Sequence, residues 1–203
     1  MGYDTDFTGR FVLNKKLSTK MHGFLDSFNK IRHVKRCMDK YGWEGEFYVN
    51  GDESGVENPN DGPPMSQPNE WCQWKPTEDG MGIEWDGNEK FYDYVIWLKY
   101  IIVKFLKPNG YILTGTVHYS GEDDYDTGNI TVVNNEIVSP RYPSGYQGED
   151  QVILGPVWVC IKGSDTWKAV VRSKLLVERQ PIEPPEPEKV YTKVPKRRIL
   201  TEN

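Results

Sequence analysis

Cysteine is scarce in this sequence, and its scarcity excludes two kinds of small protein. The 203 residues include three cysteines, Cys37, Cys72 and Cys160, at uneven spacing. They form neither a disulfide framework nor a zinc-binding pattern, and they fit a protein of a reducing cytoplasm. A chain of this length buries roughly 70% of the surface that its unfolded form exposes, so the fold needs no cross-link or metal.

Long apolar runs are also absent. No uncharged apolar stretch reaches about 18 residues, so we predict no membrane-spanning helix. The opening residues, MGYDTDFTGRF, are too polar for a secretory signal. Hydrophobic residues make up 37% of the chain and aromatic residues 13%, so we expect large rings to supply much of the core.

The sequence lacks the short motifs of common catalytic sites. It contains no glycine-rich phosphate loop, no G-x-S-x-G, no C-x-x-C and no histidine pair at metal-binding spacing. His22, His33 and His118 are scattered along the chain. The sequence leaves open a nucleophilic pair of one cysteine and one histidine, because such residues can be close in the fold while far apart in the sequence. We assign no catalytic residue, no metal ligand and no cofactor.

The segment 121–128 is the best candidate for a cation site, because carboxylates suit Ca²⁺ or Mg²⁺. It departs from an EF-hand loop, since Gly128 stands one position early and Asn135 occupies the place of the last glutamate. We therefore favour a solvated hairpin tip. Its acidic residues are Glu122, Asp123, Asp124 and Asp126.

Charge is distributed unevenly along the chain. Residues 1–43 carry a net charge of +5, residues 44–89 carry −11, and residues 90–203 carry +1. The acidic middle repels polyanions, so bulk nucleic-acid binding is not expected.

Apolar spacing predicts an alternation of strands and helices. Residues 7–13 alternate as in a strand, and residues 19–40 have helical spacing after a suitable N-cap at Ser18. The other predicted elements are a strand at 46–49, a hairpin of 71–76 and 81–85, a helix at 88–106, and a hairpin of 111–119 and 129–138. The order indicates an α+β fold, in which two helices pack on one face of an antiparallel sheet.

Three regions are predicted from these elements. Residues 1–138 form the α+β core domain, and residues 139–177 form an appended β-hairpin after a Pro- and Gly-containing linker. Residues 178–203 contain five prolines and few large apolar groups, so we expect an extended or disordered tail.

Four segments of the chain form a distinctive pattern: MGYDTDFTGRF, IRHVKR, WCQWKPTEDGMGIEWDGNEKFYDYVIWLKY and GYILTGTVHYSGEDDYDTGNITV. With them, residues 1–138 resemble uncharacterised small accessory proteins of tailed bacteriophages. The resemblance implies a protein that works in the cytoplasm of an infected bacterium. It supplies no catalytic residues, and residues 139–203 lie outside it.

The tryptophan-rich hairpin is the main candidate for a binding site. Its rings and polar groups are of the kind that a nucleobase or peptide pocket contains, although packing of these rings in the core is the commoner arrangement. A basic stripe with Arg32 and Arg36, predicted on the outer face of the first helix beside His33 and Lys40, could bind phosphate or an acidic protein. The candidate ligand-binding residues are Trp71, Gln73, Trp74, Trp85, Arg32 and Arg36.

These features favour a non-catalytic phage accessory protein that binds a host component. We expect it to counteract a bacterial defence system by sequestering a nucleotide signal or by blocking a host protein. A small nucleotide-acting enzyme with clustered carboxylates and a minor virion structural protein are the alternatives. No membrane partner is expected, and an oligomer of identical chains is left open.

Overall fold

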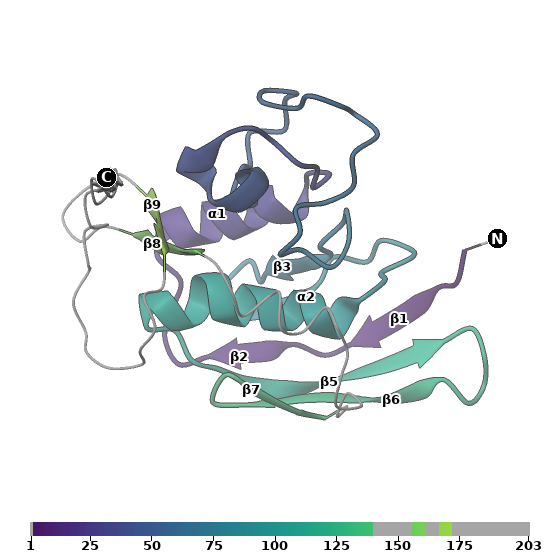
Figure 1. Ribbon diagram of the computed structural model, residues 1–203. Coiled ribbons are helices and arrows are strands. Elements are labelled where there is room, and N and C mark those ends of the chain that lie inside the picture. The colour runs from purple at the N-terminus through teal and green to yellow at the C-terminus, as the bar shows by residue number, and fades with distance from the viewer. Residues whose placement is uncertain (1, 140–155, 161–166, 172–203) are drawn as a thin grey trace, which may run out of the picture.

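The computed structural model describes residues 2–139, 156–160 and 167–171 (Figure 1). The predicted linker after Ser139, the turn of the last hairpin and the tail 178–203 lie outside these residues. No helix in the described ranges has the length and apolar character needed to cross a bilayer.

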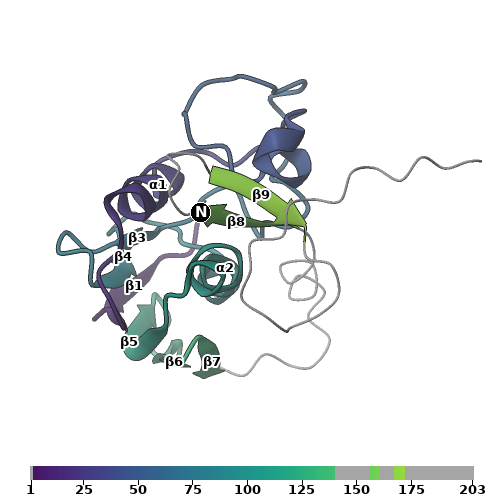
Figure 2. The ribbon, with the colours of Figure 1, turned by 90° about the vertical axis from the view of Figure 1, so that its left-hand side faces the viewer.

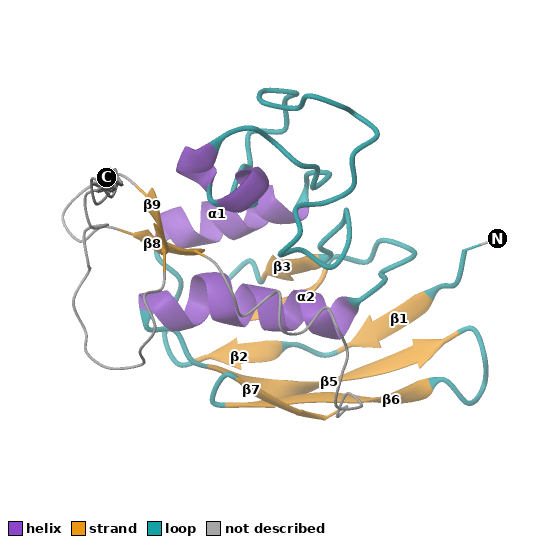
Figure 3. Cartoon of the chain, in the orientation of Figure 1, coloured by secondary structure: helices purple, strands orange, loops and turns teal. Residues whose placement is uncertain are grey.

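A seven-stranded sheet forms the base of the molecule (Figure 3). Its strand order is β3-β4-β2-β5-β6-β7, with β1 also paired to β5, and every pair is antiparallel. A separate two-stranded sheet consists of β8 and β9. The strands are β1 (Thr5–Thr8), β2 (Phe11–Leu13), β3 (Trp74–Pro76), β4 (Gly82–Trp85), β5 (Leu113–Gly121), β6 (Thr127–Val133), β7 (Glu136–Ser139), β8 (Pro156–Cys160) and β9 (Trp167–Val171).

Both α-helices lie on the same side of the large sheet (Figures 1 and 2). They are α1 (Thr19–Asn29) and α2 (Tyr94–Ile101), the latter continued by a π-helical turn, η3 (Ile102–Leu106), and a 3-10 turn, η4 (Lys107–Asn109). Strand β5 shows the two faces: Leu113 and Val117 are buried in the core, and Thr114 and His118 on the other face are exposed. The predicted α+β class is confirmed.

The first helix ends earlier than predicted, at Asn29 in place of residue 40. The segment that follows pairs its backbone with other parts of the chain: the amide of His33 donates to Glu70 O over 2.8 Å, and that of Arg36 donates to Glu44 O over 2.8 Å. These long-range bonds satisfy the amides that a helix would use, so tertiary context overrides the helical spacing. The side chain of Ser18 caps α1 as predicted, through the Met21 amide.

Two strand predictions were also wrong. Residues 46–49 follow two 3-10 turns, η1 (Asp39–Tyr41) and η2 (Trp43–Gly45), and are not a strand. The strand predicted at 129–138 is two strands, β6 and β7, because Asn134 and Asn135 have φ of 52° and 70°. Positive φ at both central residues is the geometry of a tight hairpin turn, which asparagine tolerates.

Lys104 lies in the core, where lysine is almost never fully buried unless it is paired. Its side chain is 0% exposed, and its ammonium lies 3.5 Å from Glu46 Oε2 and donates to Pro156 O over 2.9 Å. Tyr100 and Ser66 also donate to Glu46, whose other oxygen has no hydrogen-bond partner among the described residues. Burial raises the pKa of Glu46, although Lys104 opposes the shift.

The core is rich in aromatic rings, as the composition predicts. Tyr94 is partly exposed, whereas the following helix and loop residues are buried: Phe28, Ile31, Ile101, Ile102 and Phe105. Trp158 of β8 belongs to the same core, where its ring stacks on that of Phe24 at 5.7 Å between centroids. The carbonyl of Trp158 also accepts a bond from Asn109 Nδ2 over 2.8 Å. The described part of the region predicted as an appendage therefore packs on the body.

Candidate functional site

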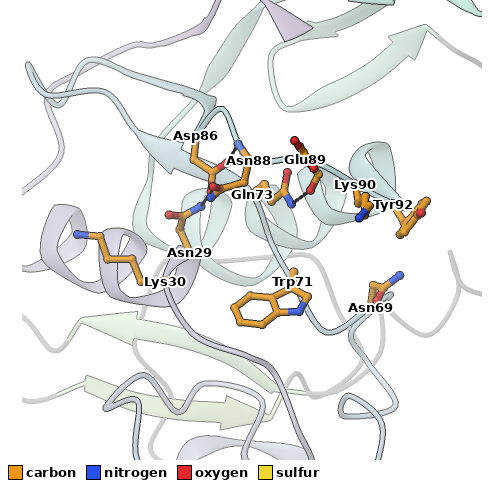
Figure 4. Close-up of a pocket in the computed structure, with 10 residues that line it drawn as sticks. All are labelled: Asn29, Lys30, Asn69, Trp71, Gln73, Asp86, Asn88, Glu89, Lys90 and Tyr92. Atoms are coloured by element: carbon orange, nitrogen blue, oxygen red, sulfur yellow. Dashed lines mark hydrogen bonds between the residues drawn. The ribbon is translucent and has the colours of Figure 1, made fainter. Parts of the chain in front are cut away.

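A cleft of about 640 Å³ opens between the end of α1, the segment before β3 and the loop between β4 and α2 (Figure 4). Its lining combines two aromatic rings, four side-chain amides, two lysines and two carboxylates. The lining residues are Asn29, Lys30, Asn69, Trp71, Gln73, Asp86, Asn88, Glu89, Lys90 and Tyr92. This mixture suits a polar ligand with a flat ring.

Trp71 supplies the largest apolar surface of the cleft. Its side chain is 47% exposed, and its ring lies across the cleft from Asn29, Gln73 and Asp86 (Figure 4). The residue lies before β3, in a segment fixed by a bond from the Asp86 amide to Gln73 O over 3.0 Å. This bond ties the segment that carries Trp71 to the loop that follows β4.

Gln73 is held in one orientation from both ends of its amide. Its Oε1 accepts from Trp85 Nε1 over 3.1 Å, and its Nε2 donates to Glu89 O over 2.8 Å. Trp85 does not line the cleft but supports Gln73 from behind. The Gln73 bonds also fix the loop that carries Glu89 to the edge of the sheet.

Asp86 organises the opposite wall. Its Oδ2 accepts from Asn29 Nδ2 and from Asn88 Nδ2, both over 2.8 Å, and its Oδ1 accepts from the Asn88 amide over 2.8 Å. Asn29 is 8% exposed and also donates to Cys72 O over 3.0 Å. Because every member is bonded to another, the wall is rigid before any ligand arrives.

The two lysines differ in their availability. Lys30 pairs with Asp26 over 2.7 Å, one turn earlier in α1. Lys90 has no ion pair with another described residue, and its backbone holds a φ of 61°, an unusual value for a non-glycine residue. Its amide donates to Asp4 Oδ1 over 3.1 Å. Such strained positions cluster at functional sites, so Lys90 is the cation best placed to meet a ligand.

Trp74 lies in the core and not in the cleft. It is 1% exposed, its Nε1 donates to Tyr94 O over 2.7 Å, and its ring meets those of Phe7 and Phe11. Of the four hairpin candidates, the fold therefore brings Trp71 and Gln73 into one cleft, with Trp85 behind them.

Arg32 and Arg36 line a second groove, of about 330 Å³, which adjoins the first at Lys30. Arg32 forms a two-pronged ion pair with Glu70, over 2.8 and 2.7 Å, which lowers the pKa of that carboxyl. Arg36 is 6% exposed, donates to Ser54 O over 2.7 Å and stacks over the Tyr48 ring. The prediction of an exposed stripe is therefore wrong for Arg36.

His33 was predicted beside that stripe and is instead buried, at 3% exposure. Its ring lies against Phe28 and Trp97, at 4.2 and 5.1 Å between centroids. Burial lowers the pKa of His33 to about 3. The imidazole is therefore a neutral core group at physiological pH.

The long segment 50–69 is tied to residues 31–37. Cys37 N donates to Gly55 O over 2.8 Å, and Lys35 N donates to Gly62 O over 3.2 Å. It forms a wall of the second groove, and only its last residue, Asn69, reaches the first cleft.

The acidic hairpin tip is bonded to the N-terminal segment. Tyr3 OH donates to Asp126 Oδ2 over 2.8 Å, and the Asp4 amide donates to Glu122 Oε1 over 3.0 Å. Within the described ranges, no group of three or more His, Cys, Asp or Glu side chains is close enough to hold a metal ion.

Most of the cleft was not identified from the sequence. The missed lining residues are Asn29, Lys30, Asn69, Asp86, Asn88, Glu89, Lys90 and Tyr92. Their types are common on any surface, and the one local signal was the turn-forming run Asp86-Gly87-Asn88 beside the tryptophan hairpin.

Comparison with protein-family models, curated proteins and solved structures finds no match.

Proposed function

We propose that this protein is a phage accessory protein that binds a nucleotide-like small molecule of the host and withholds it from a defence system. The observation that carries the proposal is the exposed face of Trp71 opposite a rigid wall of amides and a carboxylate. A ring that is 47% exposed stays open to solvent in the free protein. A bound base would remove that face from water.

Stacking supplies the main part of the expected affinity. A base on an aromatic side chain contributes about 1–3 kcal/mol in single-stranded nucleic-acid complexes. The preformed wall adds to this, because Gln73, Asn29 and Asp86 are already held and lose little freedom on binding.

The charges of the cleft favour a compact ligand over a polymer. Lys90 can meet one phosphate, whereas Lys30 is paired with Asp26, and Asp86 and Glu89 bring two negative charges. A long polyanion would also meet the acidic residues of the middle region and be repelled. A mononucleotide or a small cyclic nucleotide therefore fits best.

Binding without chemistry is the form of the proposal that the lining supports. No cysteine, histidine or serine is among the lining residues. Asp86 accepts three hydrogen bonds from Asn29 and Asn88, and these bonds hold the wall in place.

Calorimetry with nucleoside monophosphates, nucleoside diphosphates and cyclic nucleotides tests the proposal. Trp71→Ala should weaken binding of the best ligand by about tenfold or more, as loss of roughly 1.4 kcal/mol of stacking requires. Trp43→Ala is the matched control, because Trp43 is also about half exposed (51%) and lies outside the cleft. Equal affinities for the two variants would contradict the assignment.

Lys90→Gln tests the phosphate contact separately. We expect its effect on affinity to shrink as salt rises, since exposed charges are screened over about 10 Å at 0.1 M salt. Lys16→Gln, at an exposed lysine outside the cleft, is the control.

A second candidate function is the blocking of a host protein. Trp43 and Met65 are 51% and 64% exposed, and the Met65 amide donates to Glu44 Oε2 over 2.6 Å, which brings the two segments together. Exposed tryptophan and methionine are common at protein interfaces. Recovery of a host protein by the parent chain and by Trp71→Ala, but not by Trp43→Ala, would favour this function.

A further inference from the structure

The wall opposite Trp71 presents hydrogen-bond acceptors, and this follows from how Asn29 is bonded. Both hydrogens of its amide group are taken, one by Cys72 O over 3.0 Å and one by Asp86 Oδ2 over 2.8 Å. The amide cannot rotate without breaking both bonds in a side chain that is 8% exposed. The atom of Asn29 left for a ligand is its Oδ1, an acceptor.

Asp86 continues the same pattern. An ionised carboxylate has about four lone-pair directions, and three of those of Asp86 are used, so one remains on Oδ1. Asn88 donates one hydrogen of Nδ2 to Asp86, and it keeps its Oδ1 as an acceptor and its second Nδ2 hydrogen as a donor. The three side chains lie together on one side of the cleft (Figure 4).

We propose that Asn29 and Asp86 in this wall select bases that carry an exocyclic amino group, namely adenine and cytosine, over hypoxanthine and uracil, which carry oxygen at the same position. The inference rests on the proposed function, since it names the ligand class of the same cleft. An amino group donates to Asn29 Oδ1 or Asp86 Oδ1. A carbonyl oxygen at the same place would face an acceptor and leave both unpaired, which a site of fixed polar groups rejects.

The expected selectivity follows from one hydrogen bond gained or lost. We expect this bond to change the free energy of binding enough to give about a tenfold ratio in dissociation constant. Cytidine and uridine monophosphates form one matched pair of probes, and adenosine and inosine monophosphates form a second. Each pair keeps the sugar, the phosphate and the ring size, so stacking on Trp71 and the contact with Lys90 stay nearly constant.

Calorimetry of the full chain with the four nucleotides is the experiment. We expect cytidine and adenosine monophosphates to bind about tenfold more tightly than their partners. Equal affinities within both pairs would overturn this inference and leave the proposed function standing. If none of the four binds, and no other nucleotide does, the proposed function fails and the inference with it.

Asp86→Asn tests whether the carboxylate of Asp86 contributes to the preference for bases with an amino group. The substituted amide keeps its oxygen toward the Nδ2 groups of Asn29 and Asn88, so its NH₂ group takes the place of Oδ1 and also loses the bond from the Asn88 amide. The tenfold preference should then fall to about one or reverse. A variant that folds, as judged by its melting temperature, and keeps the preference would overturn the role of Asp86. If it does not fold, Asn88→Ala, at an exposed side chain, replaces it and should reduce the preference.

Discussion

Removal of the Trp158 side chain tests whether the β8–β9 hairpin is part of the folding unit. The indole is 5% exposed and its ring lies 5.7 Å from that of Phe24, 5.1 Å from that of Phe47 and 6.2 Å from that of Tyr41, between centroids. It therefore fills a space bounded by α1 and by the 41–47 segment. An independent appendage would make no such contacts.

Truncation to alanine leaves this space empty. Replacement of a buried tryptophan by alanine destabilises by about 3–5 kcal/mol, through lost transfer energy and the cavity that remains. For a domain of this size, each kcal/mol lowers the melting temperature by about 2–4 °C, so we expect Trp158→Ala to melt about 6–20 °C lower.

Thermal unfolding followed by circular dichroism measures the change. Trp43→Ala, at a side chain that is 51% exposed, serves as the control and should change stability by no more than about 0.5 kcal/mol. A melting temperature of Trp158→Ala within a degree of the parent would refute the reasoning, because the hairpin would then contribute nothing to the cooperative core.

Two further predictions concern buried charge. His33 has a pKa of about 3 in the fold against an ordinary 6.5, so the unfolded chain binds more protons between these values. Stability should be complete above pH 6.5 and fall by up to about 1.4 kcal/mol per pH unit as the pH drops toward 3. His33→Phe should reduce that slope in denaturant titrations, and an unchanged slope would contradict the assignment. Lys104→Met should destabilise by about 3–5 kcal/mol, because Glu46 is left buried without its counter-charge. Adding Glu46→Gln should recover part of this loss, and a double variant no more stable than the single one would argue against the pair.

The sequence predicts those elements whose signals are local. The β3–β4 hairpin follows from Asp79-Gly80 between two aromatic runs. The presence of both helices follows from apolar spacing, although α2 begins at Tyr94 and not at residue 88 as predicted. The end of α1 at Asn29 does not follow, because the bonds that replace the helix reach residues far along the chain. The same holds for Lys104, since its burial depends on Glu46 and on the Pro156 carbonyl.

The residues of the candidate site also fall into those that the sequence predicted and those that it did not. Trp71 and Gln73 were predicted, because rings and amides at a hairpin edge are uncommon enough to notice. Asn29 and Lys90 were not, because each becomes part of a cleft only when α1 and the loop before α2 meet the hairpin. Arg36 was misplaced for a related reason: its burial depends on Tyr48 and Ser54, which no helical pattern reveals.

The bonds between the N-terminal segment and the cleft have a consequence for the order in which the protein folds. Tyr3 N donates to Tyr92 OH and Lys90 N donates to Asp4 Oδ1, across separations of 89 and 86 residues. Closing loops of this length lowers the conformational entropy of the chain before the contacts that offset this loss have formed. During synthesis, the first residues must wait for the segment around Lys90 to leave the ribosome. We therefore expect the rim of the cleft to be completed late, after α1 and the local hairpins have formed.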